Sequence, residues 1–236
     1  MVESHKTHHT FSIRIKRLVW ASMMLWALPS VAVPLWNNSQ VKGDDYLLGT
    51  IHIGDSRLKE LPDSIKNAIE AVELVVVETD LSTVSATEQQ ALVLQLGMLE
   101  QGKTLQQELS REVFARVQAY LEQKGMAIDA VRQFKPWLVA LTMVQLSYVQ
   151  QGYDAALGVD QQVIEYARLR GKRVLGLESF KEQLSFFNQL FLEFPELKAD
   201  DLMLDTLEEL EQFSELPNVM MDAWLRADLA AFEAIY

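Results

Sequence analysis

The stretch Tyr46-Leu47-Leu48-Gly49-Thr50-Ile51-His52-Ile53-Gly54 determines how the rest of the chain is interpreted. Residues 46–51 are largely apolar and predict a β-strand, paired through a turn near 42–45 with a strand around 35–39. His52 follows this strand and lies between two glycines, which let the backbone and a ligand approach closely. It is also the only histidine after the first nine residues, and the chain has no cysteine. Chemistry that needs an imidazole of the folded domain therefore depends on His52.

Two further strands are predicted downstream, and an acidic residue follows each of them. Leu74–Val77 is a continuous apolar run, typical of a strand buried on both faces, and Glu78 comes next. Residues 173–177 form the other strand, which Glu178 follows. Ligands of open α/β sheets bind at the carboxyl ends of strands, so His52 and the two glutamates are candidates for one site. Such a set suits a divalent metal such as Zn, Mn, Fe or Co, which can lower the pKa of a bound water.

Each candidate residue could instead have a purely structural role, and the sequence does not decide between a functional and a structural role. An acidic residue after a strand often caps the next helix, as Asp80, Asp160 or Glu178 could. A lone histidine beside a strand can be structural, although loop residues at strand ends carry much function. A serine triad would need His52 as its base, but no Gly-x-Ser-x-Gly elbow occurs. The phosphate loop and the dinucleotide fingerprint are missing from the sequence as well.

Most of the remaining chain is predicted to be helical. Apolar periodicity and cap residues predict helices over 62–71, 86–96, 110–124, 136–149, 157–169 and 180–236, the last broken at Pro195 and Pro217. The predicted fold class is α/β (α+β), with a small central β-sheet, many flanking helices, and a helical middle and C-terminal half. No cap residue precedes the end of the sequence at Tyr236, so a C-terminal strand is expected to be missing.

The first 32 residues resemble a signal peptide or an N-terminal anchor. A basic segment at 14–17 precedes an apolar run at 18–28 and small residues at 30–32. The apolar stretch is shorter than the roughly 20 residues that span a bilayer. We therefore expect an exported protein, periplasmic or secreted, with one domain over 33–236 and membrane contact only through an uncleaved leader. The net charge of −12 argues against a nucleic-acid partner.

Several motifs together resemble the TraB/GumN family, which is related to the Tiki proteases. Besides residues 46–54, the matching motifs are Leu61-Pro62, Val76-Val77-Glu78-Thr79-Asp80, Lys135-Pro136-Trp137, Gly158-Val159-Asp160 and the block from Gly171 to Ser179. The resemblance covers roughly residues 34–236. It implies an exported peptidase that uses Mn or Co, or Zn, and acts on a peptide or protein. His52 and Glu78 would then be catalytic or bind the metal, Glu178 would be a third ligand, and one carboxylate would act as general base.

The chain departs from that family pattern in one respect. The family carries a second Gly-x-x-His near its C-terminus, and no such motif occurs in this sequence. The predicted site and domain are therefore incomplete. The alternative is a non-catalytic protein on the same scaffold that binds a peptide or a haem-like ligand, because one fold can host many functions. The sequence does not indicate an oligomeric state.

Overall fold

A computed structural model describes residues 34–38, 45–194 and 197–235, and it has a mixed α/β fold as predicted. The predicted leader and the turn of the hairpin lie outside these ranges. β1 (Leu35–Asn37) pairs antiparallel with β2 (Tyr46–Leu48), and β3 (Leu74–Thr79) pairs parallel with β4 (Arg173–Glu178). The described strands therefore form two small sheets instead of one central sheet.

The strand before His52 is shorter than predicted, because its backbone finds other partners. Beyond Leu48 the chain pairs with the segment that leads into α7 (Val159–Leu169). The carbonyl of Ile51 accepts a hydrogen bond from the Val159 amide at 2.8 Å, and Gly54 exchanges two backbone hydrogen bonds with Asp154. Residues 49–54 are thus an extended loop fixed to a distant part of the chain.

Ten α-helices lie within the described ranges, most of them where periodicity and caps predict them. They are α2 (Asp63–Ala71), α3 (Ala86–Gly97), α4 (Leu105–Glu108), α5 (Arg111–Gln123), α6 (Pro136–Gln150), α7, α8 (Phe180–Glu193), α9 (Ala199–Gln212), α10 (Leu216–Arg226) and α11 (Leu229–Ile235). Ser110 caps α5 by accepting from the Val113 amide. No helix in the described ranges is both long and apolar enough to cross a membrane.

The breaks in the C-terminal helices differ from the prediction. Pro217 lies in the first turn of α10 and does not interrupt it, because a proline there gives up no intrahelical hydrogen bond. The chain instead turns before Leu216, and again at Ala227, whose φ of 49° is left-handed. Pro195 lies outside the described residues.

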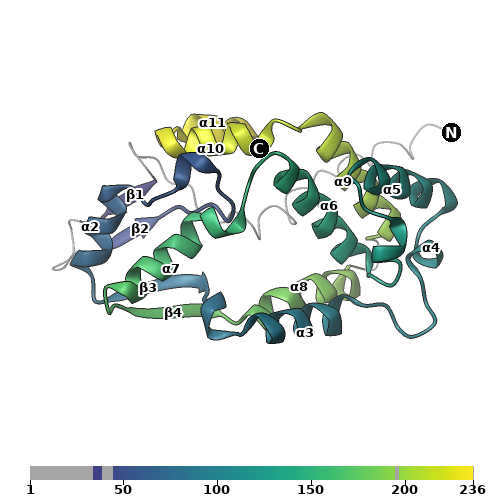
Figure 1. Ribbon diagram of the computed structural model, residues 1–236, viewed down its shortest axis with the longest axis horizontal. Coiled ribbons are helices and arrows are strands. Elements are labelled where there is room, and N and C mark those ends of the chain that lie inside the picture. The colour runs from purple at the N-terminus through teal and green to yellow at the C-terminus, as the bar shows by residue number, and fades with distance from the viewer. Residues whose placement is uncertain (1–33, 39–44, 195–196, 236) are drawn as a thin grey trace.

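The β3–β4 sheet is covered on one face. Val75, Val77 and Val174 are half-buried beneath α7, which packs against both strands and against α2 (Figure 1). Leu74 and Val76 alternate with them and are exposed, so the prediction of a strand buried on both faces is wrong for β3. The apolar residues on both faces of β3 favour a strand, but only one of these faces is buried.

Two large hydrophobic cores hold the helices together, besides a smaller cluster around Trp137, Leu138 and Leu184. One lies between α5, α6 and α9, and its fully buried members include Val117, Leu121, Val139, Met143, Met203 and Leu207. The other lies between α2, α7, α10 and the segment after His52, and includes Leu58, Ile65, Val159, Met221 and Trp224. The second core therefore fixes the elements that surround His52.

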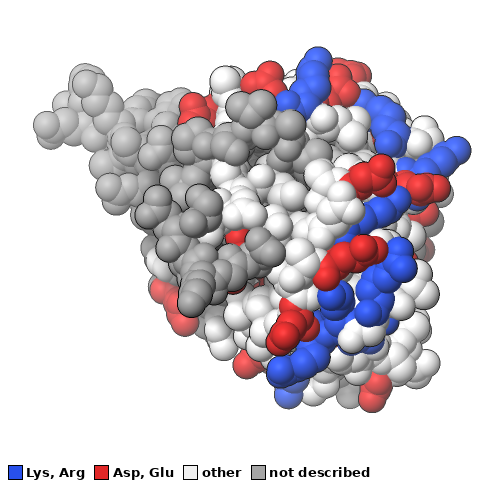
Figure 2. Space-filling model, turned by 90° about the vertical axis from the view of Figure 1, so that its left-hand side faces the viewer, with Lys and Arg blue, Asp and Glu red and all other residues white. Residues whose placement is uncertain are grey.

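Acidic and basic side chains are interleaved on the end of the molecule that carries α2 (Figure 2). Ion pairs link Arg170 to Glu70 and Lys66 to Glu60 in this region. Over the described part of this face the basic groups thus lie beside acidic ones, and such surface pairs contribute little to stability.

Candidate functional site

His52 is paired with Asp160, a residue 108 positions further along the chain. The Nδ1 atom of His52 lies 2.9 Å from the Oδ2 atom of Asp160, so with an ionised carboxylate Nδ1–H donates the hydrogen bond. Asp160 is in the first turn of α7, where the helix dipole favours a negative charge. The geometry joins an imidazole to a carboxylate that is itself stabilised by its helix.

Two glycines allow the His52 loop to lie this close to the start of α7. A Cβ atom on Gly158 would lie 2.5 Å from the carbonyl oxygen of His52, and one on Gly54 would overlap the carbonyl of Leu157. Both obstacles are backbone atoms, which cannot move aside as a flexible side chain can. Glycine at these two positions is therefore required for the pairing of His52 with Asp160.

The environment of His52 favours its protonated form. Its pKa is raised above the ordinary value of 6.5, chiefly by the hydrogen bond to Asp160. Burial acts in the opposite direction, while the negative charges of Asp160 and Glu78 raise the pKa further. The side chain is 46% exposed, and Nε2 has no hydrogen-bond partner within the described chain. Nε2 is thus the atom that a substrate, a water or a metal could reach.

The two predicted glutamates lie on different faces of the sheet. Glu78 shares the exposed face of β3 with Leu74 and Val76, and its charge acts on His52. Glu178 is opposite Thr79 in the parallel register, so the alternation of the strand places it on the other face. The charge of Glu78 therefore acts on His52 without a direct contact between them, and Glu178 lies on the other face of the sheet from Glu78.

Asp80 has the structural role that the sequence left open. It is 7% exposed, accepts hydrogen bonds from the amide and hydroxyl of Ser82, and forms an ion pair with Arg168 at 2.5 Å. It thereby caps the 3-10 helix Leu81–Thr83 and ties the end of β3 to α7. A buried carboxylate paired in this way stabilises the local fold and is unavailable for chemistry.

Asp160, by contrast, does not have the capping role that its position suggested. No side chain caps α7, and the Oδ2 atom of Asp160 faces His52 instead. Its Oδ1 atom is buried without a partner among the described residues, and water or a ligand usually satisfies such an atom. The one signal in the sequence was the glycine two residues earlier, within Gly158-Val159-Asp160.

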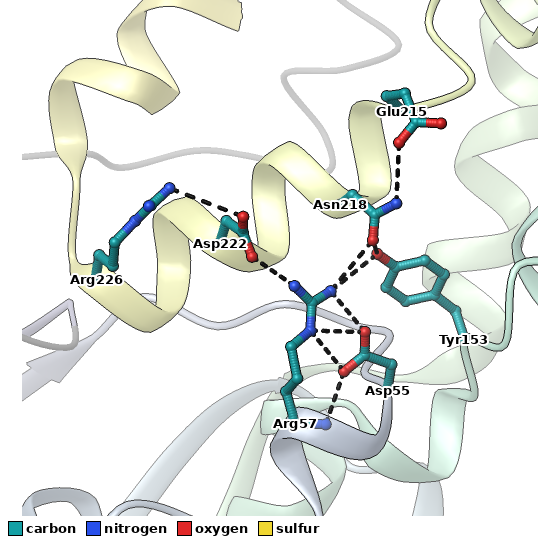
Figure 3. Close-up of polar contacts among 7 residues, drawn as sticks. All are labelled: Asp55, Arg57, Tyr153, Glu215, Asn218, Asp222 and Arg226. Carbon is teal, nitrogen blue, oxygen red and sulfur yellow. Dashed lines mark hydrogen bonds and ion pairs between the residues drawn. The ribbon is translucent and has the colours of Figure 1, made fainter.

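Helix α10 bonds to the chain on both sides of His52 in the sequence. On one side, the Nε1–H of Trp224 donates to the carbonyl of Gly49 at 2.9 Å. On the other, Arg57 donates to Asp222 at 2.5 Å and also forms a fork with Asp55. Figure 3 shows this guanidinium between Asp55 and α10, where Asn218 and Tyr153 complete the network. The loop is therefore fixed at residues 49 and 57, with His52 between them.

The residues around His52 fit a divalent metal only in part. A histidine whose Nδ1 is held by a carboxylate has the arrangement typical of metal-binding imidazoles. Nε2 of His52 and the carboxylate of Glu78 are two possible ligands, whereas catalytic zinc sites use three from the protein. Within the described residues no group of three His, Cys, Asp or Glu side chains could hold a metal ion.

Comparison with known proteins identifies the family. Residues 34–235 match the TraB/PrgY/gumN family, and the chain belongs to it. The chain is 24% identical over 216 residues to the uncharacterized protein YbaP of Escherichia coli (strain K12) and of Shigella flexneri, which covers 91% of this chain and 75% of YbaP. It is 25% identical over 177 residues to an uncharacterized protein of Treponema pallidum (strain Nichols), covering 71% of this chain and 51% of that one. No solved structure matches the chain.

Proposed function

We propose that this protein is an exported hydrolase of peptide bonds, in which the His52–Asp160 pair is the catalytic base. The observation that carries the proposal is the 2.9 Å contact between Nδ1 of His52 and Oδ2 of Asp160, which leaves Nε2 accessible. An imidazole oriented by a carboxylate through one nitrogen, with the other nitrogen open, is the arrangement that general-base catalysis requires. Its place after a strand and beside a helix N-terminus suits a site held on rigid elements.

The reaction follows from these atoms. In the neutral form of His52, Nε2 takes a proton from a water molecule that attacks the substrate carbonyl, while Nδ1–H stays bonded to Asp160. The raised pKa makes this imidazole a stronger base and requires a pH high enough to deprotonate it. Asp160 and Glu78 stabilise the imidazolium that forms, and this imidazolium returns the proton to the leaving amine. A base positioned in this way accounts for about 10²–10⁴-fold of rate acceleration.

A divalent cation, Mn, Co or Zn, belongs to this proposal through the family resemblance. Nε2 of His52 and the carboxylate of Glu78 would hold it, and a bound cation would polarise the substrate carbonyl. Nε2 would then be occupied, so His52 could not act as the base, and a carboxylate oxygen that does not bind the cation would take that role. The two versions of the proposal differ in whether activity needs the cation.

The test is cleavage of labelled casein and of a fluorogenic peptide mixture by the full chain, with added Mn, Co or Zn and with chelator. We expect His52→Gln to abolish turnover and Asp160→Asn to lower kcat by at least about tenfold, because an amide stabilises the imidazolium less than a carboxylate does. Glu78→Gln and Glu178→Gln form a matched pair, and only the first should reduce the rate. Wild-type activity in His52→Gln would overturn the proposal, and loss of activity on chelation would assign the cation-dependent version.

A second candidate is a binding protein that takes up a peptide or a haem-like ligand without turnover. The absence of a three-ligand metal group within the described residues favours it. Its signature would be calorimetric binding of an uncleaved peptide or of haem, equal with and without chelator. Any multiple turnover that depends on His52 would exclude it.

A further inference from the structure

The β3–β4 sheet leaves one face open. Leu74, Val76, Leu175 and Leu177 project from it and are 37%, 50%, 52% and 75% exposed. Val76 is opposite Leu175 in the register, and Leu177 is the next outward residue along β4, so the four are neighbours. We call these four residues the open sheet face. Contiguous apolar surface of this kind is uncommon on a monomer and marks a contact site.

Leu169 provides a contrast. It is 81% exposed, but it lies at the end of α7 and not on a strand of the open sheet face. Isolated apolar side chains on a surface are ordinary. The open sheet face differs because it belongs to two paired strands whose opposite face is packed under α7, so its shape is fixed by the fold.

Charged residues of opposite sign lie at the two ends of the open sheet face. Arg173, opposite Leu74, lies where β4 begins, and Glu78 lies near the end of β3. Within the described part of the chain neither side chain has an ion-pair partner. Four residue steps along a strand separate the two positions by about 13 Å. The face is therefore apolar in its centre, positive at one end and negative at the other.

We propose that the open sheet face binds the same face of a second copy of this chain, with the strands of the two copies antiparallel. A two-fold axis through the centre brings the partner's Arg173 to Glu78 and Arg173 to the partner's Glu78. The contact is isologous, because each copy uses the same surface. A surface with one positive end and one negative end complements itself under such an axis. Neither a lipid surface nor a uniformly charged partner would match this charge pattern.

The dimer stands independently of the proposed activity, but it has a consequence for the site. Glu78 acts electrostatically on His52, and a guanidinium beside Glu78 would offset its charge. The dimer would then weaken the influence of Glu78 on His52.

The first test is sedimentation velocity of the full chain from about 1 to 200 µM, together with light scattering. We expect a species of twice the 26.9 kDa chain mass that dissociates on dilution. Leu175→Asp should weaken association at least tenfold, because Leu175 lies opposite Val76 and the change places an unpaired charge in the apolar centre. Leu169→Asp, at an exposed leucine outside the open sheet face, is the control and should associate like the wild type.

The second test exchanges the charges. Arg173→Glu and Glu78→Arg should each weaken the dimer, and the double variant should restore it, since each ion pair is re-formed with the opposite polarity. Circular dichroism of each variant checks that the fold is retained, and the charge exchange covers the case in which Leu175→Asp does not fold. A wild-type chain that is monomeric at 200 µM, a dimer insensitive to Leu175→Asp, or a double variant no stronger than the single ones would overturn the proposal.

Discussion

The loop after β2 and the end of β4 both place polar residues directly after a strand, yet the two regions are built differently. The loop from Gly49 to Gly54 is fixed by backbone hydrogen bonds to residues 100 or more positions away, and His52 bonds to Asp160 there. At the end of β4, Ser179 and Glu182 bond to each other in a capping box that begins α8. A helix cap is satisfied by its sequence neighbours, whereas the candidate site is assembled from distant segments.

The largest expected effect comes from closing the space between the His52 loop and α7. Gly54→Ala and Gly158→Ala should each lower the free energy of unfolding by about 2–4 kcal/mol, because the new methyl group meets fixed backbone atoms. Gly176→Ala is the control, since its methyl would lie 3.1 Å from the Asp80 amide nitrogen and needs only a small adjustment. Urea denaturation measures all three. Equal losses at the three sites would contradict the account of the loop.

The next-largest effect is expected when the contacts between α10 and the His52 loop are removed. Arg57→Ala and Trp224→Phe should each cost about 1–2 kcal/mol of stability, because each leaves partners on the loop or on α10 without their hydrogen bond. Hydrogen exchange should accelerate in residues 49–58 while α5 keeps its protection. Arg226→Ala is the control, as its 3.9 Å contact with Asp222 lies at the surface. Uniform acceleration over the whole chain would show that α10 has no specific role at this loop.

The end of β4 should respond as an ordinary helix cap. Ser179→Ala is expected to lower stability by about 1 kcal/mol, because the amide of Glu182 loses its acceptor. Glu178→Gln should change stability by less than about 0.5 kcal/mol, as exposed substitutions usually do. Thermal denaturation of the two variants provides the comparison. A larger effect from Glu178→Gln would show that this strand end contains more than a cap.

The smallest expected effect is a pH dependence of stability at the His52 loop. Because the folded-state pKa of His52 is raised, the stabilisation is fully present below the unfolded value of 6.5 and is lost as pH rises through the higher folded value. The stability difference between wild type and Asp160→Asn should therefore shrink across that interval in chelator-treated protein. Half of the imidazole is exposed, so solvent limits the size of the effect. A stability difference between the two proteins that grows as pH rises would contradict a raised pKa of His52.

The fold and the site were predictable from the sequence to different degrees. Helices such as α5 and α6 were predictable because Ser110, Pro136 and the apolar periodicity act locally. His52 could be singled out as a candidate because no other histidine follows the first nine residues. The role of Asp160 was not, since a carboxylate in the first turn of a helix looks the same whether it caps that helix or bonds to a residue 108 positions away.

The predicted set of metal ligands also depended on contacts between distant residues. Three strand ends suggested one cluster, but the register places Thr79 opposite Glu178 and so separates Glu178 from Glu78. A single residue of register decides the face of every side chain on a strand. Register depends on pairing between segments about a hundred residues apart, which propensity and local spacing do not encode.

The central claim is that His52 and Asp160 act as one unit, and NMR titration of His52 tests it most directly. Histidine is labelled with ¹⁵N in the chelator-treated full chain, and the His52 signal is assigned by its loss in His52→Gln. We expect a pKa above 6.5 in the wild type and a lower pKa in Asp160→Asn. The same pKa in both proteins would contradict it.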